Sequence, residues 1–126
     1  MKQLKIATFN SVSLISRIRK QWLLNLLLKE NVDIICLQET KLSSETHVND
    51  MNFVFERHYH SFHSRAVGHS GGSGILIRKD RGFVIYPEWE TDRNGRVCSV
   101  EVIRYQESIK VISVHAPCDA ADRKLF

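Results

Sequence analysis

A chain of 126 residues can fold into one domain with a single hydrophobic core and is too short for two. With 43% hydrophobic and 25% charged residues it has the composition of an ordinary globular protein, and no apolar run approaches the roughly 18–20 residues needed to cross a membrane. The formal net charge of +4 fits a polyanionic partner and solvated surface charge equally well, so charge alone does not identify a ligand.

The beginning of the chain and its cysteines indicate the compartment. Residues 1–5 lead directly into a strand-like pattern and lack the apolar core of a secretory signal. The cysteines Cys36, Cys98 and Cys118 are odd in number and show no Cys-x-x-Cys spacing, which argues against a disulfide framework. The sequence therefore predicts an intracellular protein without membrane contact.

The first elements along the chain are a strand and a helix. Residues 5–9 alternate weakly between apolar and polar side chains, as a strand does. Residues 14–30 carry apolar side chains at helical spacing. This spacing predicts an amphipathic helix that buries Ile18, Trp22 and Leu26.

A short apolar segment follows this helix. Residues 32–37 are nearly all apolar and rich in β-branched side chains, so they predict a strand buried on both faces. Residues 43–45 are suited to begin a short helix. The polar, histidine-rich stretch that continues to Ser70 is typical of loops.

The rest of the chain has the pattern of an antiparallel meander. Its signals are a glycine-rich turn, several alternating or apolar stretches and an Asn-Gly hairpin turn. The turns lie at residues 71–74 and 92–95, and the strands at 75–77, 83–86, 97–102 and 109–114. A β-α-β unit followed by a meander predicts a mixed α/β sheet.

Three polar residues stand where predicted strands end, namely Asn10, Glu39 and His115. Strand ends hold side chains rigidly at the rim of a sheet, where active sites gather. A carboxylate suits a hard cation such as Mg²⁺, an asparagine can orient a phosphate or a metal-bound water, and a histidine can donate a proton to a phosphoryl oxygen. Each residue also has an ordinary interpretation, as a turn residue, a solvated carboxylate or a loop histidine.

Two other patterns favour structural interpretations. His58, His60 and His63, with His69 nearby, have a spacing that matches no common structural zinc site, which favours a polar loop or strand face. The glycines of residues 71–74 precede a strand, and no Gly-Lys-Ser/Thr follows them. We therefore interpret them as a tight turn and not as a phosphate-binding loop.

Four segments resemble motifs of the endonuclease/exonuclease/phosphatase superfamily, in the order and spacing of that superfamily. The most specific is residues 33–41, which read Asp-Ile-Ile-Cys-Leu-Gln-Glu-Thr-Lys and include the metal-binding glutamate of the motif. Supporting matches lie at residues 5–10, 70–77 and 111–119. The resemblance implies the N-terminal half of a four-layered α/β sandwich like that of deoxyribonuclease I, with a mixed, mostly antiparallel sheet and a flanking helix.

The sequences of these motifs are most similar to those of endonucleases of LINE-type retrotransposons. The most similar parts are Gln-Glu-Thr-Lys at residues 38–41 and Ala-Pro-Cys-Asp at residues 116–119. By this resemblance, Asn10 and Glu39 hold Mg²⁺, or Mn²⁺ in its place, together with the phosphate. His115 contacts or protonates the scissile phosphate. DNA is then the partner, and a retrotransposon product would act in the nucleus.

The sequence departs from the superfamily pattern at several positions. The early motif often reads Asn-x-Asn-Gly, whereas here Val12 and Ser13 take the last two places. His115 stands where retrotransposon and apurinic-site endonucleases have tyrosine, although the deoxyribonuclease branch has a histidine in a similar context. Cys118 replaces a common asparagine.

The superfamily's Asp-x-Asn segment and its terminal Asp-His pair are not found within residues 1–126. Those residues orient the nucleophilic water, bind the phosphate and supply the base. We therefore expect a partial domain that is inactive alone and needs the C-terminal half or a partner chain. Its sheet should expose an apolar face or edge. Two alternatives stay open: a phosphoesterase of the same superfamily acting on small or lipid phosphates, and a non-catalytic remnant that binds DNA or protein.

Overall fold

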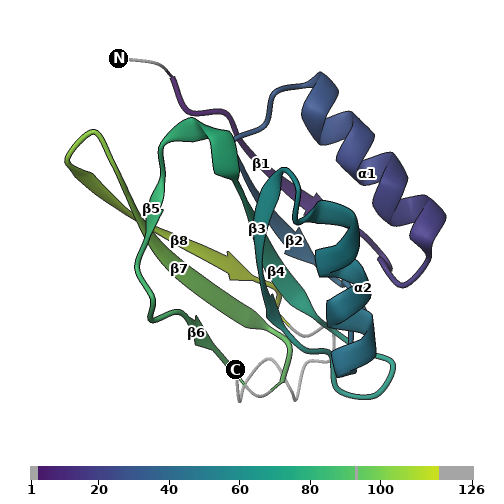
Figure 1. Cartoon of the computed structure of the whole chain (residues 1–126). Helices are drawn as coiled ribbons and strands as arrows, with labels where there is room; N and C mark the ends of the chain where they lie inside the picture. Colours follow the sequence, from purple (N-terminus) through teal and green to yellow (C-terminus); the bar gives the residue numbers. More distant parts are fainter. Residues whose placement is uncertain (1–2, 93, 117–126) are drawn as a thin grey trace.

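The computed structural model describes residues 3–92 and 94–116, which form three layers. Two helices cover one face of a four-stranded sheet, and a second four-stranded sheet packs against the other face (Figure 1). The chain is thus mixed α/β, as the sequence predicts. The described residues account for three of the four layers of the expected sandwich.

The first sheet has the strand order β1-β2-β4-β3. β1 and β2 run parallel and are connected by α1, whereas β4 pairs antiparallel with both β2 and β3. This is the predicted β-α-β start of the chain. The elements of this half are β1 Ile6–Asn10, α1 Arg17–Lys29, β2 Ile34–Gln38, α2 Glu45–Phe55, β3 Tyr59–Ser64 and β4 Ser73–Arg78.

In the second sheet, β7 pairs with β8 along one side and with the short strands β5 and β6 along the other. All of these pairings are antiparallel, and β6, β7 and β8 form a meander as predicted. The predicted strand at residues 75–77 belongs instead to the first sheet, as β4. The Asn-Gly turn signal falls between β6 and β7. The elements are the 3-10 turn η1 Lys79–Arg81, β5 Val84–Ile85, β6 Glu90–Thr91, β7 Val97–Arg104 and β8 Glu107–Val114.

β2 is buried on both faces, as predicted. It lies between β1 and β4 within its sheet, and between the helices and the second sheet across it. Ile35 and Leu37 point into the core beneath the helices, and Ile34 points into the core between the sheets. A strand held on every side is a rigid support for the residue that follows it, which is Glu39.

Helix α1 packs with a different face from the predicted one. The prediction that Ile18, Trp22 and Leu26 are buried is wrong, because they are 83%, 53% and 39% exposed. The helix carries two adjacent apolar stripes, and helical spacing alone cannot rank them. Lys20 decides between them: its buried ammonium group lies 2.6 Å from the carboxylate of Asp50 on α2. The buried residues of α1 are Lys20, Leu23, Leu24 and Leu27.

Both helices begin after a serine. The Ser16 hydroxyl accepts the N–H of Arg19, so α1 begins at Arg17 and not at residue 14 as predicted. The Ser44 hydroxyl accepts the N–H of His47 at 3.1 Å, which confirms the predicted short helix after residues 43–45. No helix in the described part of the chain is long and apolar enough to span a membrane.

β3 corrects the prediction that the histidine-rich stretch is all loop. Tyr59 and His63 are buried on this strand, and Phe62 on the opposite face packs against the core between the sheets. Polar side chains occupy several of its inward-facing positions. The apolar alternation that reveals a strand in a sequence is therefore lost.

The sandwich is open beside β1 and β8. Each is an outermost strand of its sheet, and a groove of about 370 Å³ lies between them. Ile6 and Ile112 line this groove and are 56% and 52% exposed. The predicted exposed apolar edge is therefore present.

Candidate active site

The parallel register of β1 and β2 brings two candidate residues to one edge of the first sheet. Asn10, the last residue of β1, is paired with Gln38, the last residue of β2, and Glu39 follows directly. His115 follows the last residue of β8 on the second sheet. Strand ends from both sheets therefore contribute to one rim.

Glu39 and His115 are in contact across the two sheets. Glu39 Oε1 lies 3.2 Å from His115 Nε2, and the side chains are 26% and 18% exposed. This distance allows an ion pair when the imidazole is protonated, but the ring nitrogen is not aligned for a hydrogen bond. The carboxylate is thus engaged by one neighbour and still accessible to solvent.

The backbone conformation of Glu39 directs its side chain toward His115. Along β2 the side chains alternate: Leu37 faces the helices and Gln38 faces β8. Simple alternation would turn Glu39 to the helix side. Its φ of 52° is left-handed and redirects the chain at this residue. A side chain in this region costs about 1 kcal/mol or more, so the surrounding loops must hold it there.

The glycine-rich turn before β4 clamps the loop that carries Glu39. The N–H groups of Thr40 and Lys41 donate to the carbonyls of Gly72 and Gly71, both at 3.0 Å. Gly72 leaves no room for a side chain, because a Cβ would lie 2.3 Å from Thr40 Oγ1 and 2.9 Å from the Lys41 nitrogen. The segment is a tight turn, as the sequence predicts. Its packing against the Glu39 loop is not visible in the sequence.

The same main-chain network reaches His115 through the loop before β7. Gly72 N–H donates to the Gly95 carbonyl, and His115 N–H donates to the Arg96 carbonyl, both at 2.9 Å. Asp92 shapes this loop, since its Oδ1 accepts the N–H of Arg96 at 2.9 Å. Burial raises the pKa of Asp92, but main-chain N–H donors and a serine hydroxyl outweigh burial and hold this pKa below its usual value.

Asn10 stands at the rim, while its carboxamide supports its own loop. Asn10 Oδ1 accepts the N–H of Val12 at 3.1 Å. Val12 is 62% exposed and has a φ of 61°, a conformation that asparagine tolerates and β-branched residues seldom adopt. The structure therefore brings Glu39 and His115 into contact and places Asn10 next to Gln38, the residue before Glu39, by strand register.

Gln38 belongs to this rim, although the sequence analysis does not single it out. Its Nε2 donates to Thr8 Oγ1 on β1 at 3.1 Å and to Ser113 Oγ on β8 at 3.3 Å. Ser113 Oγ donates in turn to the Leu37 carbonyl at 3.0 Å. The available signal is that all three polar residues occupy strand positions that face the opposite sheet.

Two side chains at the rim carry oxygen atoms of the types that a hard cation accepts. Glu39 supplies a carboxylate and Asn10 an amide oxygen, which are ligand types that Mg²⁺ accepts. Among residues 3–92 and 94–116, no group of three or more His, Cys, Asp or Glu side chains is placed to hold a metal ion. Cys118 and Asp119 of the last motif lie outside the described residues.

Two of the four histidines in the histidine-rich segment lie on a strand, and they face opposite sides of it, so the histidines do not share one strand face. His60 and His63 lie on β3. His63 is fully buried, neither of its ring nitrogens has a hydrogen-bond partner, and burial lowers its pKa from 6.5 to about 4. The ring is therefore neutral near pH 7 and packs as a core side chain.

The protein is thus an α/β sandwich in which strand ends of both sheets meet at a carboxylate and a histidine. Residues 12–125 match the Endonuclease/Exonuclease/phosphatase family, and the chain belongs to that family. Its members generally depend on a divalent metal. No curated protein matches this sequence.

Solved structures share the fold. An AP endonuclease from Archaeoglobus fulgidus is 26% identical with a TM-score of 0.66, and the match covers 91% of this chain and 42% of that chain. D. rerio TDP2 complexed with single strand DNA product is 20% identical with a TM-score of 0.66, covering 93% and 47%. The Xenopus laevis APE2 catalytic domain is 20% identical with a TM-score of 0.63, covering 97% and 49%. The chain thus spans about half the length of these deoxyribonuclease-I-like structures.

Proposed function

We propose that this chain is the Glu39-bearing half of a divalent-metal-dependent phosphodiesterase that cleaves DNA, related to the endonucleases of LINE-type retrotransposons. The observation that carries the proposal is the contact of Glu39 with His115 at a rim shared by both sheets, in a member of this family. An AP endonuclease and a complex with a single-strand DNA product among the structural neighbours support DNA as the substrate. The sequence Gln-Glu-Thr-Lys at residues 38–41 supports a relation to the endonucleases of LINE-type retrotransposons.

Each rim residue has a role in this proposal. Glu39 and Asn10 hold Mg²⁺, with Mn²⁺ as a substitute, and the bound metal supplies Lewis-acid stabilisation of charge on a phosphate oxygen. His115, 3.2 Å from the Glu39 carboxylate, donates a hydrogen bond or a proton to the phosphate beside it. The loop clamped by Gly72 keeps Glu39 oriented, so no reorganisation is needed when the phosphate arrives.

We also propose that cleavage needs a second half-domain, as the C-terminal half or as a partner chain. The chain matches less than half of the A. fulgidus enzyme, 42%. The open groove beside β1 and β8 offers two strand edges and exposed apolar side chains to further strands. The second apolar stripe of α1, made of Ile18, Trp22 and Leu26, is exposed as well. The Trp22 ring lies with its centroid 6.0 Å from that of Phe9 on β1, tilted by 49°.

Nicking of supercoiled plasmid tests the proposal. Residues 1–126 alone should give no nicking above background, because losing members of a catalytic unit typically costs several orders of magnitude in rate. Joined to the second half of an intact relative, the chain should nick DNA only with Mg²⁺ or Mn²⁺. Glu39→Ala should abolish that nicking, and the exposed control Glu88→Ala should not.

Three outcomes of this assay would count against the proposal. Robust nicking by the isolated chain would show that no second half is required. Nicking that is indifferent to Glu39→Ala would show that the chemistry lies on other residues. Hydrolysis of small or lipid phosphates without DNA cleavage would favour the alternative phosphoesterase.

A further inference from the structure

Gln38 ties together the three strands that carry the candidate site. We infer that it is a positioning residue: its carboxamide fixes the second sheet against the first at this rim and so keeps His115 beside Glu39. This inference rests on the proposed function for its catalytic meaning. The tie itself consists of hydrogen bonds within the chain and involves no metal ligand.

The tie is a continuous set of hydrogen bonds across both sheets. Gln38 Nε2 reaches Thr8 Oγ1 on β1 at 3.1 Å and Ser113 Oγ on β8 at 3.3 Å. Ser113 is 1% exposed and returns a hydrogen bond to the Leu37 carbonyl at 3.0 Å. The side chain of Ser113 is therefore held to β2 from two directions.

The spacing along each strand connects this tie to the site. Gln38 directly precedes Glu39. Thr8 lies two residues before Asn10, and Ser113 lies two residues before His115. Residues two apart in a strand are on the same face and roughly 7 Å apart. Each tied residue is thus within two residues of a candidate site residue, which lies on the same strand or directly after it.

Apolar packing alone does not supply this constraint. Contacts between two apolar sheet faces are non-directional and permit small sliding movements, whereas a hydrogen bond has a defined length and angle. The groove beside β8 also leaves this side of the sandwich without an apolar cover. The 3.2 Å contact between Glu39 and His115 bridges the two sheets here, so it needs their relative position to be fixed.

The experiment compares metal-free and metal-bound chains of residues 1–126. Gln38→Met keeps the side-chain length and removes the carboxamide, and Ser113→Ala removes its partner on β8. The control is Ser61→Ala, which removes a side-chain hydrogen bond to Asn52 between β3 and α2. One readout is the nuclear Overhauser effect between the His115 ring and the Glu39 side chain without metal. The other is Mn²⁺ affinity by electron paramagnetic resonance, with Glu39→Gln as the baseline.

We expect Gln38→Met and Ser113→Ala to lose the His115–Glu39 Overhauser effect and to weaken Mn²⁺ binding about tenfold, as loss of groups that orient a metal ligand does. The double variant should be no weaker than either single variant, and Ser61→Ala should keep both signals. A double variant that adds the two losses would indicate two separate effects and overturn the tie.

The outcomes separate this inference from the proposed function. If wild-type Mn²⁺ affinity equals that of Glu39→Gln, the metal site of the proposed function fails, and the Overhauser effect alone decides the role of Gln38. If Gln38→Met keeps that effect at wild-type strength, the positioning role is overturned. Should Gln38→Met not fold, Ser113→Ala gives the same decision, and a wild-type chain without the effect would also overturn the inference.

Discussion

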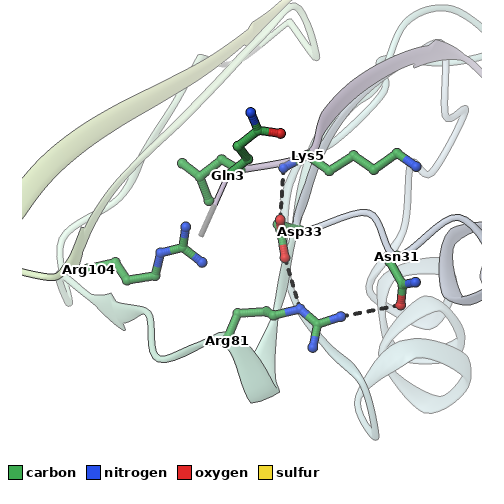
Figure 2. A pocket seen from close by; sticks show the side chains of 7 residues that line it. Gln3, Lys5, Asn31, Asp33, Arg81 and Arg104 are labelled. Atoms are coloured by element: carbon green, nitrogen blue, oxygen red, sulfur yellow. Dashed lines mark hydrogen bonds and ion pairs between the residues drawn. The ribbon is translucent and has the colours of Figure 1, made fainter. Parts of the chain in front are cut away.

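The two ends of the first sheet each hold a carboxylate, and the two carboxylates differ in their hydrogen bonds and in their exposure to solvent. Where β2 begins, Asp33 uses both oxygens: Oδ2 accepts the N–H of Lys5 at 2.8 Å, and Oδ1 accepts the Nε–H of Arg81 at 2.9 Å (Figure 2). Arg81 also donates to Asn31 Oδ1 at 3.4 Å. A cavity of about 680 Å³ lies at this end, and its other lining residues are Gln3, Leu4 and Arg104.

At the opposite end, the corresponding groups are less satisfied. Glu39 contacts His115 alone among the ionic partners found in the described chain, and its side chain is 26% exposed against 7% for Asp33. Val12, Glu39 and Lys41 all have left-handed φ values, of 61°, 52° and 62°.

The larger of the two cavities and the more accessible carboxylate therefore lie at opposite ends of one sheet. The larger cavity surrounds a carboxylate whose hydrogen bonds are already made. The carboxylate with a free side sits on strained backbone that only the surrounding loops can hold. Strain and unsatisfied groups persist where a function requires them, so they indicate the site better than volume does.

The largest expected effect on stability belongs to His63. It lies at the Glu39 end, against Gly74 of β4, and its folded pKa is about 4 instead of 6.5. Between these pH values, His63 is therefore protonated in the unfolded chain and neutral in the folded chain. Stability that is complete above pH 6.5 should be lost by roughly 3 kcal/mol as the pH falls to about 4.

Urea denaturation at pH 7 and at pH 4.5 measures this loss. His63→Phe should remove the His63 share of the pH dependence, and the exposed control His69→Gln should retain it. An unchanged pH dependence in His63→Phe would show that the unpartnered ring is not what makes this end sensitive to acid.

The two carboxylates themselves should differ in the next largest effect. Asp33→Ala leaves the Lys5 N–H and the Arg81 Nε–H without their acceptor. It should cost about 2 kcal/mol, less than loss of one partner of a fully buried pair, because Arg81 is partly exposed. Glu39→Ala should change stability by no more than about 0.5 kcal/mol. Thermal unfolding of both variants at pH 7 checks this, and equal losses would remove the distinction between the two ends.

Val12→Asn should give a gain of about 1 kcal/mol, smaller than the loss expected for Asp33→Ala, since asparagine tolerates the left-handed conformation that valine adopts at high cost. The control is Val67→Asn at a similarly exposed position, 57% against 62%. Chemical denaturation measures both variants. A gain at residue 67 as large as that at residue 12 would mean that relief of backbone strain is not the cause.

The sequence predicts the parts of the fold whose signals are local. The apolar run before Glu39, the serine before α2 and the glycine turn before β4 all appear where expected. The buried face of helix α1 and the strand β3 are not predicted, for opposite reasons. The helix has more apolar surface than one face can bury, and β3 places polar side chains where apolar ones would reveal a strand.

At the candidate site, the sequence predicts which strand ends carry the candidate residues. It does not predict the direction in which their side chains point. Alternation along β2 points Glu39 toward the helices, and only its left-handed φ brings it to His115. That conformation depends on the loop around Gly72, more than thirty residues further along the chain. Gln38 was missed because its partners, Thr8 and Ser113, are near it only once both sheets have formed.

The main-chain network around the rim has a consequence for how this chain tolerates mutation. Hydrogen bonds between peptide groups do not depend on side-chain identity, so most replacements in the loops that support Glu39 and His115 should leave their frame intact. Gly72 and Gly95 are the exceptions, because a Cβ at either position would lie within 2.7 Å of a neighbouring atom. The side chains that touch a substrate can therefore diverge while the frame persists, as long as these two glycines remain.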